Sequence, residues 1–334
     1  MRKNFQLMSL AVMSFVIVSC SDVSLDNADT ALNSLNKSSR NEGKEGKDRG
    51  CAAMDVLEEN LREDPSLKER MDDVEKHTKD FEKKMKNGRV GATGTLVIPV
   101  VVNVLYSNVN ENISAAQIQS QIDVLNRDFS ATNPDLGLVP SAFTSSVSNL
   151  EYQFTLSSVI RKSSTKTSWG TRDAMKNSKK GGIDPTSPTT TLNIWVCNIG
   201  GGILGYAQFP GGSLATDGVV VGPQYFGNTG FVSAPYDKGR TATHEVGHWI
   251  NLRHIWGDAA CGNDLVTDTP TQQTSNFGCP SFPRVTCGNG PNGDMFMNYM
   301  DYTDDLCMYM FSGGQKTRSR AVFAIGGARA SFNP

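Results

Sequence analysis

Three histidines are clustered in one short stretch of this chain, and they restrict its folding more than any other feature. The sequence HEVGHWINLRH at residues 244–254 contains three of the four histidines in all 334 residues. On a helix, His244 and His248 lie one turn apart on the same face, so both imidazoles can reach one ion. Glu245 lies about 100° further round the helix, where it can hold a water beside that ion. The stretch therefore predicts a helix that carries a metal site.

The third histidine, His254, can reach the same ion only if the helix ends and the chain turns back sharply. Asn251 stands where that turn is needed, and asparagine is the best-tolerated non-glycine residue at positive φ. Three neutral imidazoles leave the fourth position of a tetrahedral zinc open for water. This arrangement is typical of catalytic zinc, and it favours a zinc hydrolase over a chance match to the HExxH pattern.

The N-terminus predicts export. A positively charged start precedes an apolar run at residues 7–18, which is too short to span a bilayer and is typical of a signal peptide. The run ends in IVSC, which resembles a bacterial lipobox, so we expect residues 1–20 to be removed or processed and Cys20 to be lipidated. Ordinary secretion with cleavage nearby is the alternative. Lipid on Cys20 would attach the precursor to a membrane before maturation.

Two segments separate this start from the globular part. Residues 21–50 are polar and nearly free of large apolar side chains, which predicts a flexible tether. From Met54 to Lys86 apolar residues recur every three or four positions and break at Pro65, which predicts two amphipathic helices. We expect residues 51–88 to form a helical pro-segment, with a plain helical spacer as the alternative. The catalytic domain then occupies residues 89–334.

Charge is concentrated in the predicted helices, since residues 55–89 hold 20 of the 66 charged side chains. Such dense opposite charges suit a solvated outer face. The rest of the chain is sparsely charged and has no basic stripe, which argues against a nucleic-acid partner.

The remaining pattern predicts an α/β (α+β) fold. A β-branched run at residues 96–106 indicates a buried strand. The apolar side chains of residues 113–129 lie near one helical face, and Ser114 is the candidate N-cap of this helix. Further strand-like runs lie at residues 152–160, 192–196 and 218–221. Strands around a long helix indicate a sheet backed by helices. From Asp258 onward glycine, proline and polar residues dominate, which predicts irregular structure.

Cysteines are expected to hold this irregular region together. Four of the seven cysteines lie in it, at Cys261, Cys279, Cys287 and Cys307. In an exported protein they are better explained by two disulfides than by a metal site, and three pairings are open. We expect Cys197, in a strand-like stretch, to be a buried free thiol.

The histidine stretch, extended to HEVGHWINLRHIWGD, and the later sequence NYMDY together resemble the metzincin metalloproteases. More narrowly, they resemble the pappalysin family and its cytophagalysin branch, over roughly Thr95 to the C-terminus. Asn251 replaces the glycine of the general metzincin motif, as it does elsewhere in this branch. The resemblance implies a twisted sheet with backing and active-site helices, then a disulfide-stapled irregular subdomain.

The resemblance also implies roles for individual residues. Its zinc ligands would be His244, His248 and His254, and its general base would be Glu245. Met300 would lie beneath the metal in the Met-turn. Tyr302 would present its phenol to the oxyanion, with a buried core tyrosine as the alternative.

Cys51 would coordinate the zinc in a latent precursor, because a thiolate is a good zinc ligand and metzincin pro-segments use such a cysteine. An exposed thiol or an intermolecular disulfide is the alternative. The family's disulfides imply the pairs Cys261–Cys287 and Cys279–Cys307.

The family also binds calcium, for which Asp264, Thr267 and Thr269 are the candidate oxygen ligands, with a solvated loop as the alternative.

Substrate recognition is expected at Leu204, Gly205 and Tyr206, a short strand within a glycine-rich stretch. In metzincins a sheet edge at this place accepts the substrate as an antiparallel strand, whereas a tight hairpin without such a role is the alternative. Several relatives prefer a basic residue just after the scissile bond, and Asp305 is the candidate acid for that pocket. The family's acid falls where this chain has Leu306.

These features predict an exported or surface-attached zinc endopeptidase, made as a latent precursor and acting on proteins or peptides as a monomer. The alternatives are a surface binding lipoprotein with a structural zinc and an inactive homologue. The intact Glu245 and the open fourth zinc position argue against both. A maturation cut is expected at Gly88–Arg89.

Overall fold

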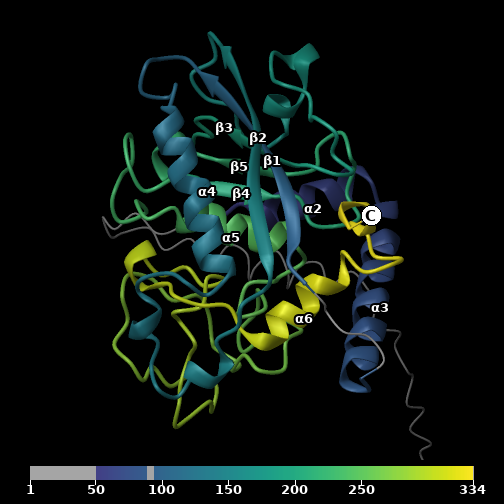
Figure 1. Cartoon of the computed structure of the whole chain (residues 1–334), viewed down its shortest axis with the longest axis vertical. Coiled ribbons are helices and arrows are strands. Elements are labelled where there is room, and N and C mark those ends of the chain that lie inside the picture. The colour runs from purple at the N-terminus through teal and green to yellow at the C-terminus, as the bar shows by residue number, and fades with distance from the viewer. Residues whose placement is uncertain (1–49, 89–93, 334) are drawn as a thin grey trace, which may run out of the picture. The chain divides into compact units, whose positions relative to one another are not determined.

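The computed structural model describes residues 50–88 and 94–333 (Figure 1). The predicted signal peptide with Cys20, all but the last residue of the predicted tether, and Arg89 lie outside these residues. Within the described part of the chain, no helix has the length and apolar character needed to cross a membrane.

Most helices and strands occur where the sequence predicts them, but the helix at Gly313–Ala321 was not predicted, because it lies in the region after Asp258 that was expected to be irregular. The helices are α2 (Ala53–Glu63), α3 (Ser66–Lys86), α4 (Ala115–Phe129), α5 (Arg240–Trp249) and α6 (Gly313–Ala321). The strands are β1 (Leu96–Tyr106), β2 (Tyr152–Ser163), β3 (Leu192–Val196), β4 (Gly205–Ala207) and β5 (Val219–Val221). Short 3₁₀ turns lie at Leu136–Leu138, Thr144–Ser146, Ala174–Lys176, Ser178–Lys180, Pro223–Tyr225, Asp305–Cys307 and Ala330–Phe332.

The five strands form one sheet in the order β2-β1-β3-β5-β4 (Figure 1). Strands β2, β1, β3 and β5 run parallel, and β4 pairs antiparallel with β5 at one edge. Parallel strands need both faces covered, and β1 alternates its side chains accordingly. Ile98, Val100 and Val102 join the core that also contains side chains of α4 and α5, whereas Leu105 joins a second cluster on the other face with Trp195.

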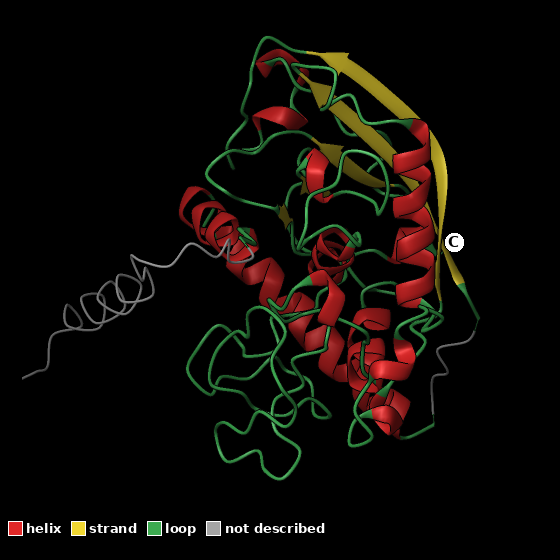
Figure 2. Ribbon diagram, turned by 90° about the vertical axis from the view of Figure 1, so that its left-hand side faces the viewer, coloured by secondary structure: helices red, strands yellow, loops and turns green. Residues whose placement is uncertain are grey.

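Local signals fix where the helices begin and end. The side chain of Ser114 accepts a hydrogen bond from the backbone N–H of Gln117 and so caps α4, as predicted. Pro65 separates α2 from α3 at the expected break. Helix α3 is long and packs against α6, and both are labelled in Figure 1. Figure 2 shows the helices and strands of the same fold from the side.

The chain after Asp258 is largely irregular, and two disulfides cross-link it. They join Cys261 to Cys287 and Cys279 to Cys307, the pairs that the family resemblance implies. Cys197 is a buried free thiol on β3's C-terminal side, as expected. A separate apolar cluster that includes Trp256, Met297 and Met310 supports this subdomain.

Candidate active site

Helix α5 carries the HExxH stretch through the core, and all ten of its residues are buried. Its first turn is held by Asp305, whose Oδ2 accepts hydrogen bonds from the backbone N–H groups of Lys238 (2.9 Å) and Arg240 (3.1 Å). A carboxylate beside a helix N-terminus accepts hydrogen bonds from N–H groups that have no partner within the helix. Its negative charge also interacts favourably with the positive end of the helix dipole. The structure therefore gives Asp305, predicted to line a substrate pocket, a place under the start of the zinc-site helix.

The three histidines of the motif converge. The Nε2 atom of His248 lies 3.1 Å from the Nε2 of His244 and 3.1 Å from the Nε2 of His254. The rings of His244 and His248 are 4.7 Å apart, as expected for neighbours one turn apart on a helix. Three imidazole nitrogens therefore point at one place.

The sharp turn that brings in the third histidine is built on Asn251, which has a φ of 77°. The N–H of Asn251 donates to the carbonyl of His248, and the N–H of Leu252 donates to that of Gly247. These two bonds form a Schellman helix end, which requires a left-handed residue at the position of Asn251. The prediction for this turn is correct.

Each imidazole is oriented by an acceptor at its other ring nitrogen. The Nδ1 atoms of His244 and His248 lie 2.7 Å from the carbonyl of Tyr299 and 2.9 Å from that of Leu252, respectively. The Nδ1 of His254 lies 2.5 Å from Oδ1 of Asp258. These acceptors place the proton on Nδ1 and leave the Nε2 lone pairs to bind a metal.

The donor set fits zinc. Burial lowers the pKa of His248 well below its ordinary value, which keeps this imidazole in the neutral form that coordinates metal. The four candidate ligand atoms, one each from Cys51, His244, His248 and His254, all lie within 4.8 Å of one another. Nitrogen and sulfur donors in such a compact group suit tetrahedral zinc.

Met300 packs directly against α5. A Cβ added to Gly247 would lie only 2.4 Å from the Sδ of Met300, so the helix can carry no side chain at this position. Met300 is fully buried, and its carbonyl accepts a hydrogen bond from Ile255 just after the third histidine. The methionine thus contacts helix α5 on one side and, through its carbonyl, the segment just after His254 on the other.

Tyr302 borders the histidines on another side. Its ring centroid lies 4.9 Å from that of His254 and 5.7 Å from that of His244. Burial raises the pKa of its phenol, with further increases from nearby groups such as Cys51, so the phenol stays protonated and can donate a hydrogen bond. In this structure its hydroxyl lies 3.5 Å from the carbonyl oxygen of Cys51.

The segment at residues 50–52 lies along β4 and places Cys51 beside the histidines. The N–H of Leu204 donates to the carbonyl of Gly50, and the N–H of Ala52 donates to that of Gly205, so the segment pairs in parallel with β4. This places the Sγ of Cys51 3.6 Å from Oε2 of Glu245 and 3.7 Å from Nε2 of His248. The predicted strand edge at β4 and the cysteine therefore lie together beside the histidines.

Gly205 leaves room for the carboxylate of the motif. A Cβ at Gly205 would lie 3.0 Å from Cγ of Glu245, so β4 passes close over this side chain. By contrast, the side chain of Tyr206 turns into the second core, where its hydroxyl donates to Asp173 at 2.8 Å. Only the main chain of Tyr206 could therefore meet a substrate.

The calcium candidates are partly brought together. The hydroxyl of Thr269 lies 2.9 Å from both carboxylate oxygens of Asp264, whereas Thr267 is exposed. Burial raises the pKa of Asp264 to about 7 despite the hydrogen bonds from Thr269 and Val266. A cation beside this carboxylate would offset its loss of water.

Two residues of the site were missed in the sequence. Asp258 orients His254, and an acid four residues after the third histidine was a signal that could have revealed it. Phe209 packs its ring 5.2 Å from that of His248, and no motif marked it.

Three buried imidazoles with a glutamate beside them, under an edge strand that can pair with an extended chain, define a zinc metalloendopeptidase. Residues 188–324 match the Peptidase_M43 family, described as pregnancy-associated plasma protein-A. The chain belongs to this pappalysin-type family.

Three known proteins are similar to this chain over most of its length. An extracellular metalloprotease of Pyricularia oryzae is 32% identical over 245 residues, which cover 71% of this chain and 79% of the relative. Mature mirolysin of Tannerella forsythia with a cleaved peptide is 46% identical, with a TM-score of 0.70, and covers 72% of this chain and 96% of its own. A promirolysin mutant of Tannerella forsythia is 43% identical, with a TM-score of 0.76, and covers 85% and 97%.

Proposed function

We propose that the mature enzyme hydrolyses peptide bonds with Glu245 as general base and His244, His248 and His254 as zinc ligands. The observation that carries this proposal is the convergence of three Nε2 atoms beside the carboxylate of Glu245. Zinc bound there supplies Lewis acidity, which lowers the pKa of water and polarises the scissile carbonyl.

The chain's own residues perform the remaining steps. Glu245 takes a proton from the attacking water and returns it to the departing amine. Tyr302, protonated and beside the histidines, donates a hydrogen bond to the carbonyl oxygen as negative charge develops on it. Asp258 is a positioning residue, because it acts on the reaction only by holding His254.

We propose that the main chain of β4 at Leu204, Gly205 and Tyr206 holds the substrate as an added antiparallel strand. The support is that the same N–H of Leu204 and carbonyl of Gly205 already pair with an extended segment, the one that carries Cys51. A peptide with main-chain hydrogen bonds at this edge would lay its scissile bond over Glu245, which lies directly beneath Gly205.

We propose that residues 51–88 are a pro-segment and that Cys51 occupies the fourth zinc position in the precursor. The support is the location of the Cys51 Sγ near His248 and Glu245. Promirolysin also covers more of this chain than mature mirolysin does. The zinc endopeptidase is therefore latent until this segment is removed.

From the family resemblance we propose that the mature enzyme cuts denatured proteins before lysine or arginine, and we expect a zinc chelator to abolish cleavage. Mass spectrometry of the new N-termini in a digested proteome measures both. The enzyme's own N-terminus should obey the same rule and begin at Arg89, since the proposed self-processing cut is Gly88–Arg89. Cut sites without a basic residue after them would refute the preference while leaving the peptidase activity intact.

We also propose calcium at the segment that carries Asp264, Thr267 and Thr269. Saturating Ca²⁺ should raise the melting temperature of the mature enzyme by on the order of 5 °C, because a ligand that binds only the folded state stabilises it. The increase should shrink as pH falls below about 7, where Asp264 becomes protonated. Asp264→Asn should lose it, and Asp123→Asn, at an exposed carboxylate on α4, should keep it. An equal shift in Asp264→Asn would exclude this site.

Export is supported by the relatives, which are named extracellular metalloproteases. We propose in addition that Cys20 is lipidated, so that the precursor is attached to a membrane until maturation releases the enzyme. We further propose that the mature enzyme acts on proteins or peptides as a monomer.

A further inference from the structure

Two arginines meet beside the end of helix α5, and a single carboxylate of the pro-segment binds both. Arg318 of α6 donates from Nη1 to Oε2 of Glu75 at 3.0 Å and from Nη2 to Oε1, a bidentate pair. Arg253 approaches the same Oε1 to 3.7 Å. Arg318 is fixed from behind, since its Nε donates to the carbonyl of Asn251 at 2.8 Å. We refer to Arg253 and Arg318 as the arginine pair.

The side chains of the arginine pair and of Glu75 are largely shielded from water. The side chains of Arg318, Glu75 and Arg253 are 2%, 17% and 21% exposed. Burial alone would raise the pKa of Glu75, but the hydrogen bonds and charge of Arg318 outweigh it and lower that pKa. A carboxylate is therefore strongly favoured in this place.

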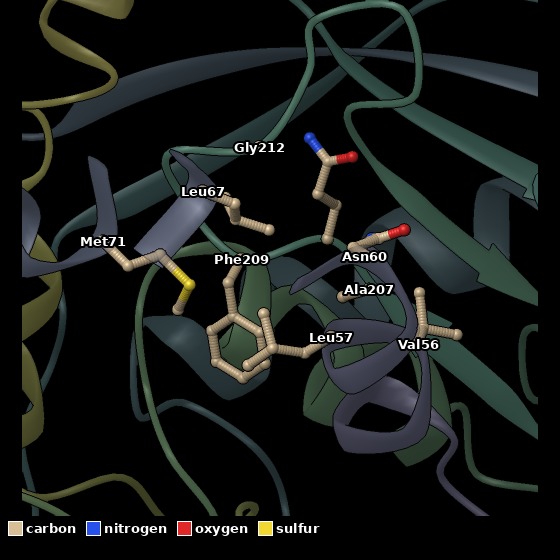
Figure 3. Close-up of a pocket in the computed structure, with 9 residues that line it drawn as sticks. Val56, Leu57, Asn60, Leu67, Met71, Ala207, Phe209 and Gly212 are labelled. Atoms are coloured by element: carbon tan, nitrogen blue, oxygen red, sulfur yellow. The ribbon is translucent and has the colours of Figure 1, made fainter. Parts of the chain in front are cut away.

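The arginine pair adjoins the zinc site through one aromatic side chain. The guanidinium of Arg253 lies 5.2 Å from the ring centroid of Phe209, whose ring packs against His248. On its other side Phe209 meets the pro-segment, where Leu57, Leu67 and Met71 line a small cavity with it (Figure 3). Removal of the pro-segment would uncover both Phe209 and the pair.

The strand direction assigns the pair to one side of the scissile bond. Phe209 follows the C-terminal end of β4, two residues after Ala207. A substrate antiparallel to β4 lays its N-terminal part along this end of the strand. The arginine pair therefore lies where residues preceding the scissile bond would pass.

Little else neutralises the pair after maturation. Glu75 and Glu82, the acidic groups of α3 that act on Arg318, leave with the pro-segment. Asp258 also acts on Arg253, but its carboxylate is bound to His254.

Asp264 also acts on Arg318, but its carboxylate is bound to Thr269. Among the described residues, Glu75 is the only carboxylate within salt-bridge distance of either arginine. The Nε of Arg253 has no hydrogen-bond partner even with Glu75 in place.

We propose that in the mature enzyme the arginine pair is a subsite for an acidic side chain of the substrate, on the N-terminal side of the scissile bond. Glu75 occupies this subsite in the precursor. The inference rests on the proposed peptidase function and adds a second element of specificity to it. Arg253 and Arg318 together offer a planar fork and a further donor, which a carboxylate matches and an amide does not.

The test uses the zinc-loaded mature enzyme and quenched fluorescent peptides built on one of its own cut sequences. Glutamate and glutamine are compared at each of the four positions before the cut. At one position glutamate should raise kcat/KM about tenfold over glutamine, and added salt should reduce this ratio. Arg253→Gln should lower the ratio, since only the fork of Arg318 is left, and Arg253→Lys should keep more of it than Arg253→Gln does.

Arg161→Gln is the matched control, because Arg161 is an exposed arginine on β2, and it should leave the ratio and the rate unchanged. Equal cleavage of the glutamate and glutamine peptides at all four positions would overturn the subsite while leaving the peptidase function standing. An undiminished glutamate preference in Arg253→Gln would also overturn it. If no peptide is cut, the peptidase function fails and the subsite with it.

Discussion

We expect Glu245→Ala to bind zinc and fold normally but to turn over substrate on the order of 10²–10⁴-fold more slowly, because it removes the carboxylate that lies beside the histidine nitrogens and takes the proton of the attacking water. The ligand nitrogens of His244, His248 and His254 do not depend on this carboxylate for their orientation, since each is held by its own Nδ1 partner. The measurement is kcat on a peptide substrate, together with the zinc content of the purified enzyme.

Asp123→Ala provides the control, since it removes an exposed carboxylate from α4 and should keep full activity. A Glu245→Ala enzyme with unaltered kcat would exclude Glu245 as the base. A loss of zinc in this variant would instead mean that the carboxylate has a role in holding the metal site together.

The second large effect is expected at the metal itself. In a precursor that carries Glu245→Ala to prevent self-cutting, zinc-edge X-ray absorption should show a sulfur scatterer at about 2.3 Å. Adding Cys51→Ala should remove it and leave nitrogen and oxygen ligands only. Cys51 is the cysteine that the structure places beside the histidines, with its Sγ 3.7 Å from Nε2 of His248.

Cys197→Ala in the same background is the control for this experiment. Its thiol is free, as is that of Cys51, but it is buried within the second core and belongs to no group of ligands among the described residues. The sulfur signal should therefore persist in this variant. A parent precursor with no sulfur around its zinc would refute the cysteine ligand and leave latency to another group of the pro-segment.

Sequence reasoning succeeded where the signal is local. A continuous β-branched run defines β1, and Ser114 together with the apolar spacing defines α4. The metal-binding stretch is equally local, because His244, His248 and the turn at Asn251 follow from helix geometry and from the backbone preferences of single residues.

Contacts between segments that are distant in sequence could not be predicted from the sequence. The ion pair of Glu75 with Arg318 joins residues 243 positions apart, and only folding brings α3 onto α6. Asp305 was expected at a substrate pocket because of its nearness in sequence to the Met-turn, yet its carboxylate accepts hydrogen bonds from the backbone N–H groups of Lys238 and Arg240, around the start of α5. The order of the cysteines permitted three pairings, and the structure contains the one that the family implies.

The parallel pairing of the Cys51 segment with β4 has a consequence for how the proposed precursor would hold a peptide beside its own histidines without digesting it. This segment runs in the direction opposite to that of an antiparallel substrate. Each of its peptide bonds therefore points its carbonyl carbon along β4 where a substrate would have its amide nitrogen. In the proposed precursor, Cys51 also takes the position at the metal that the attacking water needs, so the segment offers neither the substrate direction nor a nucleophile beside it. In the proposed precursor the segment would therefore occupy the site without being cut, and latency would end only with a cut elsewhere in the chain.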